Sequence, residues 1–183
     1  MVGSFSAAAR IVEAARIGHI AAFTVLYPAL ASADDNRLPK SFRLAWIFLL
    51  AVSAGGSILL FLLAKPIMEI FFGAEYASAI LVLKILACTL IPYTISSYLT
   101  LAFLARKKEV IILRVLTLSL ILLLALNLWL TPLTGQIGAG WAVLIAETVQ
   151  AVLFALIWMK NTSTQMDEFQ PKGVLHELSD PSQ

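Results

Sequence analysis

The chain has 183 residues, of which 60% are hydrophobic and only 13% are charged. A soluble domain of this length cannot bury so large an apolar fraction, so the composition excludes an ordinary soluble protein and indicates an integral membrane protein. The net charge of +2 at pH 7 gives no concentrated basic face, so we expect no nucleic-acid partner. The single cysteine, Cys88, excludes an internal disulfide and a cysteine-based metal site.

Apolar stretches long enough to cross a membrane follow one another along the chain. A helix of about 20 residues crosses roughly 30 Å of hydrocarbon. The sequence therefore predicts an all-α integral membrane fold over residues 1–160, with five transmembrane helices at about 5–33, 43–64, 77–105, 110–131 and 137–159. Pro132 and Gly135 are expected to end the fourth helix. Residues 161–183 are polar and are expected to form a disordered cytoplasmic tail.

The distribution of Lys and Arg predicts the orientation, because short connections rich in both residues stay in the cytoplasm. The first and third connections and the residue after the last span carry most of them: Arg37, Lys40, Arg43, Arg106, Lys107, Lys108 and Lys160. We therefore expect a cytoplasmic C-terminus, with Met1 on the far side of the membrane. No leading domain explains how Met1 would arrive there, so the chain is expected to be the end of something longer.

The N-terminal half of the first helix is unusually charged. Arg10, Glu13 and Arg16 are three residues apart, so each is rotated by about 60° from the last and they cannot all face one neighbour. If the helix lines a polar cavity, Arg16 is the deepest cation. The alternative is that this half lies at the interface and that its Arg side chains reach the lipid head groups.

Two prolines and two further cations interrupt the apolar pattern. Pro92 leaves the carbonyl of Cys88 without its helical donor and predicts a bend, and Pro28 is expected to act likewise near the end of the first helix. Both are candidate hinges, although local hydrogen bonding can also absorb such a bend. Lys84 and Arg114 lie inside the third and fourth helices, where reaching the head groups explains Arg114 more easily than Lys84.

Glu147 lies near the middle of the last apolar stretch, where an ionised carboxylate costs several kcal/mol. It therefore requires a partner, a bound proton or a water-filled path. One interpretation is a protonated Glu147 that hydrogen-bonds to Gln150 or Asn127 and serves packing alone. The other is a functional carboxylate that balances a cavity cation or carries a coupling proton. The sequence leaves both open.

Motifs for enzymatic chemistry were not found: there is no Gly-rich phosphate loop with Lys and no nucleophile elbow. We therefore expect a protein that is not an enzyme and that uses no cofactor or metal. Polar and helix-distorting residues inside the spans are instead typical of a pathway through a bundle.

Several strings resemble the C-terminal lobe of the polysaccharide and O-antigen flippase family, which belongs to the multidrug, oligosaccharidyl-lipid and polysaccharide exporter superfamily. The resemblance covers residues 2–160. The strings are VGSFSAA at 2–8, RIVE at 10–13, YPAL at 27–30, FGAEYASA at 72–79, LKIL at 83–86 and NL at 127–128, followed by Pro132, Gly135 and Gly138. Thr131 and Gly140 depart from the residues usual in that family without changing the class.

The resemblance implies two six-helix lobes around a central cavity, with this chain supplying helices eight through twelve. It implies transport of an undecaprenyl-pyrophosphate-linked oligosaccharide across the bacterial cytoplasmic membrane for capsule, exopolysaccharide or O-antigen synthesis. Cavity cations would meet the anionic group, and the candidates are Arg10, Arg16, Lys84 and Arg114. Glu147 or Glu13 would balance charge or carry a coupling proton. The implied partners are the lipid-linked oligosaccharide, membrane lipids and a separate N-terminal half of the carrier.

Two other classes stay open. One is a related exporter of drugs or of another lipid-linked cell-wall precursor, because shared architecture does not fix the cargo. The other is a non-transporting membrane scaffold, in which every intramembrane charge serves packing or faces lipid. Because alternating access requires two bundles around a shared site, we expect the chain to be inactive alone.

Overall fold

The computed structural model describes the backbone of residues 2–31 and 40–168, and side chains for residues 3–17, 44, 46–73 and 75–160. The described backbone is helical apart from short connections and contains no strand, which confirms the all-α class. The helices are α1 (Val2–Ala31), α2 (Lys40–Leu62), α3 (Ala64–Phe72), the 3₁₀ turn η1 (Ala74–Tyr76), α4 (Ala79–Cys88), α5 (Leu90–Ala105), α6 (Glu109–Thr134) and α7 (Gln136–Glu168).

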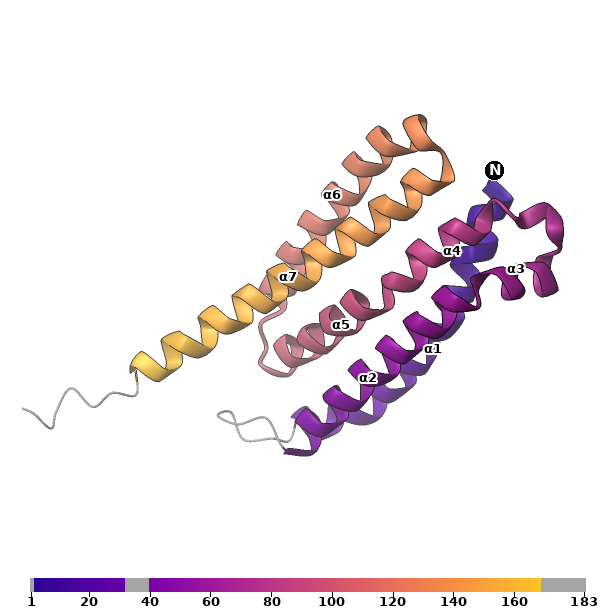
Figure 1. The fold of residues 1–183 in the computed structure, drawn as a ribbon. Coiled ribbons are helices and arrows are strands. Elements are labelled where there is room, and N and C mark those ends of the chain that lie inside the picture. Colours follow the sequence, from indigo (N-terminus) through magenta and orange to yellow (C-terminus); the bar gives the residue numbers. More distant parts are fainter. Residues whose placement is uncertain (1, 32–39, 169–183) are drawn as a thin grey trace, which may run out of the picture.

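The helices form an elongated bundle with two distinct ends (Figure 1). The N-terminus, α3 and the α6–α7 turn lie at one end, and the α5–α6 connection and the C-terminal part of α7 lie at the other. Within the described residues, three segments are long and apolar enough to cross a membrane: Ala79–Ala105, Glu109–Thr134 and Gln136–Lys160. The bent pair Trp46–Leu62 and Ala64–Phe72 makes a fourth if it is one span. The predicted span 5–33 is described only in part, because the side chains of residues 18–33 lie outside the described set.

Two prolines account for two breaks in the helices. Pro66 has no N–H to donate to the Leu62 carbonyl, and α2 ends at Leu62 with a 67° bend into α3. Pro92 likewise has none for the Cys88 carbonyl, and α4 ends at Cys88. The helix is therefore broken at Thr89, one turn before the proline, although Ala79–Ala105 remains a single candidate span; the bend at Pro92 stays a prediction. The sequence predicts a span at 43–64 and no separate helix after it, whereas the structure places α3 directly after the bend.

The α6–α7 connection is a single residue. The sequence predicts that Pro132 and Gly135 end α6. The helix continues through Pro132 to Thr134, so Pro132 does not end it. Gly135 does end it, and its φ of +62° suits glycine. A Cβ added at Gly138 would overlap the Leu130 carbonyl and the Thr134 hydroxyl, so the hairpin requires glycine there. The last helix also runs further than the predicted 137–159, because α7 continues to Glu168.

Two clusters of buried side chains lie in different parts of the bundle. The first joins α1, α3 and α4 through Ala8, Met68, Val82 and Leu83, which are all fully buried or nearly so. The second is largely aromatic and joins α5, α6 and α7; its buried members are Tyr98, Leu99, Phe103, Val115 and Phe154. Between them, α2 packs on α4 and α5 through buried Ser53, which hydrogen-bonds to Thr94.

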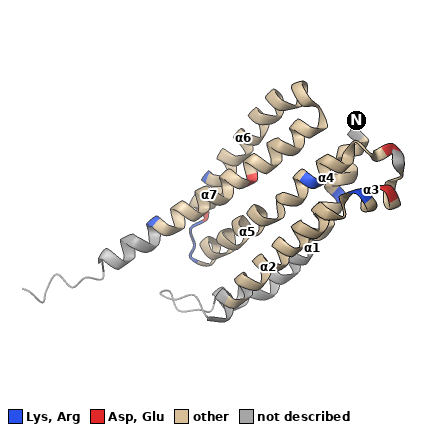
Figure 2. Cartoon of the chain, viewed as in Figure 1, with Lys and Arg blue, Asp and Glu red and all other residues tan. Residues whose placement is uncertain are grey.

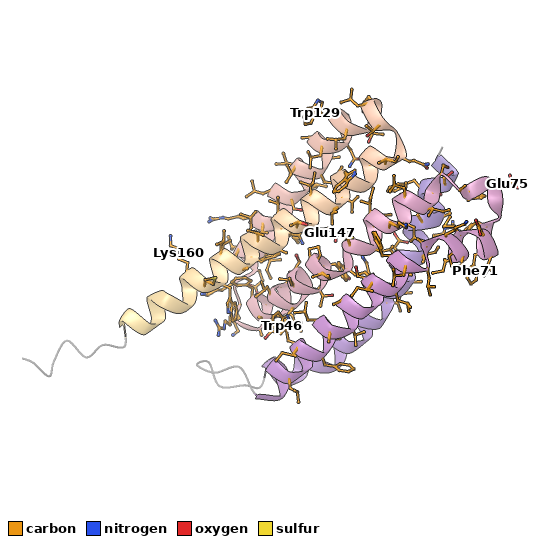
Figure 3. All side chains as sticks on the ribbon, viewed as in Figure 1. Trp46, Phe71, Glu75, Trp129, Glu147 and Lys160 are labelled. Carbon is orange, nitrogen blue, oxygen red and sulfur yellow. The ribbon has the colours of Figure 1, made fainter. Side chains whose placement is uncertain are left out.

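Apolar side chains cover much of the outer surface, as expected where a bundle meets lipid. Along α6, Leu128 is 80% exposed and only Val115 and Ser119 are buried. Basic residues of the α5–α6 connection lie at the end opposite α3, where Lys160 also lies (Figures 2 and 3). Trp46 and Trp129 lie toward opposite ends, as aromatic residues do at the two membrane interfaces (Figure 3).

Candidate functional site: an ion pair inside the bundle

An ion pair joins the first and last helices near the middle of the bundle. Arg16 on α1 donates through Nη2 to both carboxylate oxygens of Glu147 on α7, at 2.8 and 3.0 Å. The two side chains are 20% and 19% exposed, so both charges are largely removed from the surface. Figure 3 shows Glu147 between the two ends of the bundle. A charge at this depth requires such compensation.

The break between α4 and α5 holds the arginine from the other side. The Thr89 hydroxyl accepts a hydrogen bond from Arg16 Nη2 at 2.7 Å and donates to the Leu86 carbonyl at 2.6 Å. The Tyr93 ring, one turn along α5, lies 4.3 Å from the guanidinium carbon, which is a cation–π contact. Because Pro92 interrupts the helix here, Thr89 stands between α4 and α5, beside the guanidinium. Three elements therefore fix the position of one cation.

A cavity of about 410 Å³ opens beside the ion pair. Hydroxyl and amide groups are set into a wall that is otherwise mostly apolar, beside the charged pair. Its lining residues come from α1, α5, α6 and α7: Arg16, Tyr93, Ser96, Ser97, Thr100, Leu101, Leu104, Leu116, Glu147 and Gln150. Arg16 Nε and Ser96 Oγ are buried without a hydrogen-bond partner among the described residues. Unpaired donors at such a depth are costly, so the cavity suits a polar or anionic ligand, or water.

A second cavity of about 170 Å³ also borders Arg16. Glu13 lines it with Phe5, Val12 and Leu86, and Arg16 is the residue that lines both cavities. Glu13 is exposed and makes no ion pair within the described part of the chain. Glu13 therefore lies near the site, but Arg16 forms its ion pair with Glu147.

The other predicted cations do not join this site. Arg10 and Arg114 are exposed and line none of the cavities described here. Lys84 is half-buried between α4 and α2, with Nζ 5.1 Å from the Phe61 ring, and has no carboxylate partner among the described residues. Of the four candidate cations, only Arg16 lines these cavities within the described residues, and the assignment of Arg10, Lys84 and Arg114 to a central cavity stays a prediction. Their spacing along three helices turns them toward different neighbours.

Hydrogen bonding separates the two interpretations of Glu147. Asn127 donates to the Leu123 carbonyl at 3.0 Å and accepts from Thr131 at 3.3 Å, so its amide serves its own helix. Glu147 faces Arg16 instead of Asn127 or Gln150. The packing-only interpretation, with a carboxyl bonded to one of those amides, does not describe this structure.

The two candidate hinges, Pro92 and Pro28, lie in different helices. Pro92 lines a largely apolar cavity of about 260 Å³ between α5 and α7. Pro28 lies within α1, which continues to Ala31, but its side chain is outside the described set. Sequence reasoning missed Thr89 and Tyr93. Their spacing of four residues across a proline break, which places both on one helix face, was the available signal.

The fold and site define a class: a multi-pass helical membrane protein with a polar, ion-paired site inside the bundle, as in transporters. A family model described as lipid II flippase MurJ matches residues 7–175. This match covers most of the chain, and the protein belongs to that family. Neither the search of curated proteins nor the search of solved structures gave a match.

The family corrects the resemblance drawn from the sequence strings. A flippase family for lipid-linked precursors is confirmed, together with the membrane class. The narrower assignment to polysaccharide or O-antigen flippases is not supported, because the matching family is described by lipid II.

Proposed function

We propose that this chain is part of a flippase that moves a lipid-linked cell-wall precursor of the lipid II class across the bacterial cytoplasmic membrane. The observation that carries the proposal is the Arg16–Glu147 pair in a polar cavity inside a lipid-facing bundle. Membership of the lipid II flippase family supplies the cargo class. The proposed activity is transport, with no covalent chemistry, and it requires no cofactor or metal.

Arg16 is the proposed contact for the anionic pyrophosphate. A guanidinium presents its donors as a planar fork that fits phosphate oxygens in pairs. In this structure Nη2 is engaged by Glu147, whereas Nε is buried without a partner among the described residues. Because Nε is buried, a phosphate would reach this donor only as the guanidinium turns away from Glu147. The phosphate would compete with Glu147 for the N–H donors of Nη2.

Glu147 is the proposed competitor that keeps Arg16 neutralised while the cavity is empty. When phosphate takes over the guanidinium, the carboxylate loses its counter-charge and becomes the group best placed to accept a proton. Within the described residues, Arg16 of α1 pairs with it, and Tyr93 of α5 is the other titratable side chain that lines the same cavity. Through this exchange, substrate binding and proton uptake would be linked at one site.

Alternating access moves two bundles about a shared site, so we propose that these helices act with a second bundle supplied by an N-terminal half of the carrier. The basic end of the bundle, with the C-terminal part of α7, is proposed to face the cytoplasm. Membrane lipids and the lipid-linked precursor are the other proposed partners. Pro92 is the proposed hinge, because it lies beside the break between α4 and α5 at Thr89 and next to Tyr93.

A binding experiment tests the proposal on the chain as it stands. The chain is placed in lipid nanodiscs, and the binding of a fluorescent lipid II analogue is titrated for the native sequence, Arg16→Gln and Arg114→Gln. We expect Arg16→Gln to weaken binding by roughly 10- to 100-fold, because a hydrogen bond to a charged group contributes about 1.5 to 3 kcal/mol. Arg114→Gln removes an exposed arginine of the same type and is expected to leave binding unchanged.

Equal losses in both variants would show that any intramembrane arginine matters and would count against this site. A precursor that carries the same pyrophosphate and sugars but no peptide separates the cargo classes. Weaker binding of this compound than of lipid II supports the lipid II class. Equal or tighter binding favours the polysaccharide precursor, and no binding of either supports the scaffold.

A further inference from the structure

The short helix α3 carries an apolar face that no described part of the chain covers. Ile70 is 78% exposed and Phe71 is 74% exposed, although both lie in a helix that packs against the bundle. The cavities discussed above do not involve α3, and the transport site does not use it. The face therefore requires its own explanation.

The residues of α3 fall into three sectors when they are placed at about 100° per residue. Ala64 and Met68 are fully buried and face the bundle. Lys65 and Glu69 form a polar sector, with 3.9 Å between Nζ and Oε1. Ile70 and Phe71 lie about 100° apart, each roughly 120 to 140° from the middle of the polar sector; Phe71 lies beside the buried sector, about 20° from Ala64, and both side chains are nevertheless exposed.

The direction of α3 distinguishes it from the spans. Its axis is bent by 67° from α2 at Leu63. Because spanning helices tilt on average by about 20° from the bilayer normal, a helix bent this far from one of them runs much closer to the membrane plane. Figure 3 shows Phe71 and Glu75 at the end of the bundle that carries Trp129, opposite the end that carries Lys160 and Trp46.

The apolar face of α3 continues the surface that α2 presents to lipid. Leu59, Leu62 and Leu63 are 57%, 69% and 41% exposed and lead directly into the bend. We propose that α3 is an interfacial helix, with Ile70 and Phe71 inserted into the lipid at the head-group boundary and Lys65 and Glu69 turned to water. The occupant of this face is the bilayer itself, argued from its continuity with the lipid-facing side of α2.

Such a helix would fix where the membrane surface crosses the bundle. Gly73, with a φ of +89°, ends α3, and the Phe72 ring lies 5.5 Å from that of Tyr76 in η1. Since Phe72 and Tyr76 also pack on the buried cluster with Met68, the inserted face is held rigidly to α1 and α4. The bilayer would then set the depth of the whole lobe.

Spin labels measure this arrangement in the full chain. Cys88→Ser provides a background without cysteine and keeps a donor for the Lys84 carbonyl, which Cys88 contacts at 3.4 Å. Single cysteines at Ile70, Phe71 and Glu69 are labelled with a nitroxide, and the protein is placed in vesicles of phosphatidylethanolamine and phosphatidylglycerol. Accessibility to oxygen and to a water-soluble nickel chelate gives the depth of each label.

We expect labels at Ile70 and Phe71 to lie about 5 to 10 Å below the head-group boundary, the depth of interfacial helices. The label at Glu69, on the polar sector of the same turn, is expected on the water side. Equal access to nickel at all three positions would overturn the proposal, because α3 would then stand in water. Immobile labels at Ile70 and Phe71, shielded from both reagents, would also overturn it by showing a protein partner. Two labelled variants report on the apolar face. If the variant at one of these positions does not fold, the variant at the other still measures the depth of the face.

Discussion

Two regions of the bundle each hold a cation, and they do so by different means. Arg16, in the middle, has a carboxylate at 2.8 Å, a hydroxyl at 2.7 Å and an aromatic ring at 4.3 Å. Arg106, at the end of α5, has the Trp158 ring at 4.2 Å and no carboxylate partner among the described residues. Deep in the bundle a full counter-charge is required, whereas near the membrane surface a ring and nearby water suffice.

The comparison predicts that the largest loss follows from removing the counter-charge. Glu147→Ala would leave Arg16 uncompensated inside the bundle and is expected to lower the free energy of unfolding by about 3 to 5 kcal/mol. Unfolding of the chain by sodium dodecyl sulfate in mixed micelles measures this. The double variant Arg16→Met with Glu147→Leu is expected to recover most of the stability without recovering ligand binding. A double variant as unstable as the single one would contradict the argument.

The aromatic end is expected to depend on packing. Phe154 is fully buried, and its ring centroid lies 5.8 Å from that of Phe103. Phe154→Ala is expected to cost about 3 kcal/mol through the cavity that it leaves. The same unfolding assay measures it, with Val152→Ala, at a half-exposed position of α7, as the matched control. Equal effects at the two positions would show that this cluster is not a core.

A smaller effect is expected at Thr89, which supports Arg16 without carrying charge. Thr89→Val keeps the shape but removes the acceptor for Arg16, with an expected cost of about 1 to 2 kcal/mol. Thr148→Val is the control, because Thr148 bonds only the Leu144 carbonyl of its own helix, at 2.7 Å on an exposed face. Ligand binding is expected to weaken only in the Thr89 variant, and loss in both would remove Thr89 from the site.

The smallest effect is expected for the cation at the end of α5. Arg106→Gln removes a partly exposed cation–π contact and is expected to change the free energy of unfolding by about 0.5 to 1 kcal/mol. Measurement beside Arg114→Gln, an exposed arginine with no such ring contact among the described residues, separates the ring contact from general charge effects. A loss as large as that of Glu147→Ala would mean that depth does not decide how a cation is held.

Much of the fold could be predicted from the sequence because lipid-spanning helices must satisfy their own backbone and so require long apolar runs. The breaks in the helices were harder to predict. Pro92 indicated the break after α4, but Pro66 carries the same signal and was not interpreted in this way, so α3 was not predicted. The position of Glu147 in an apolar stretch indicated that its carboxylate requires a partner, but the sequence did not identify the cation. Arg16 lies 131 positions away, and only the packing of α1 against α4, α5 and α7 turns it there.

The single-residue connection at Gly135 has a consequence for how the chain enters the membrane. Both helices of the α6–α7 hairpin are apolar, and between Thr134 and Gln136 there is no polar loop to carry across. Leaving either helix alone in the bilayer would expose the face that includes Gly138, Ala142 and Ala146, which is built to meet a neighbouring backbone. The hairpin is therefore expected to insert as one unit during synthesis, with its register set by close approach of the backbones before the rest of the bundle assembles.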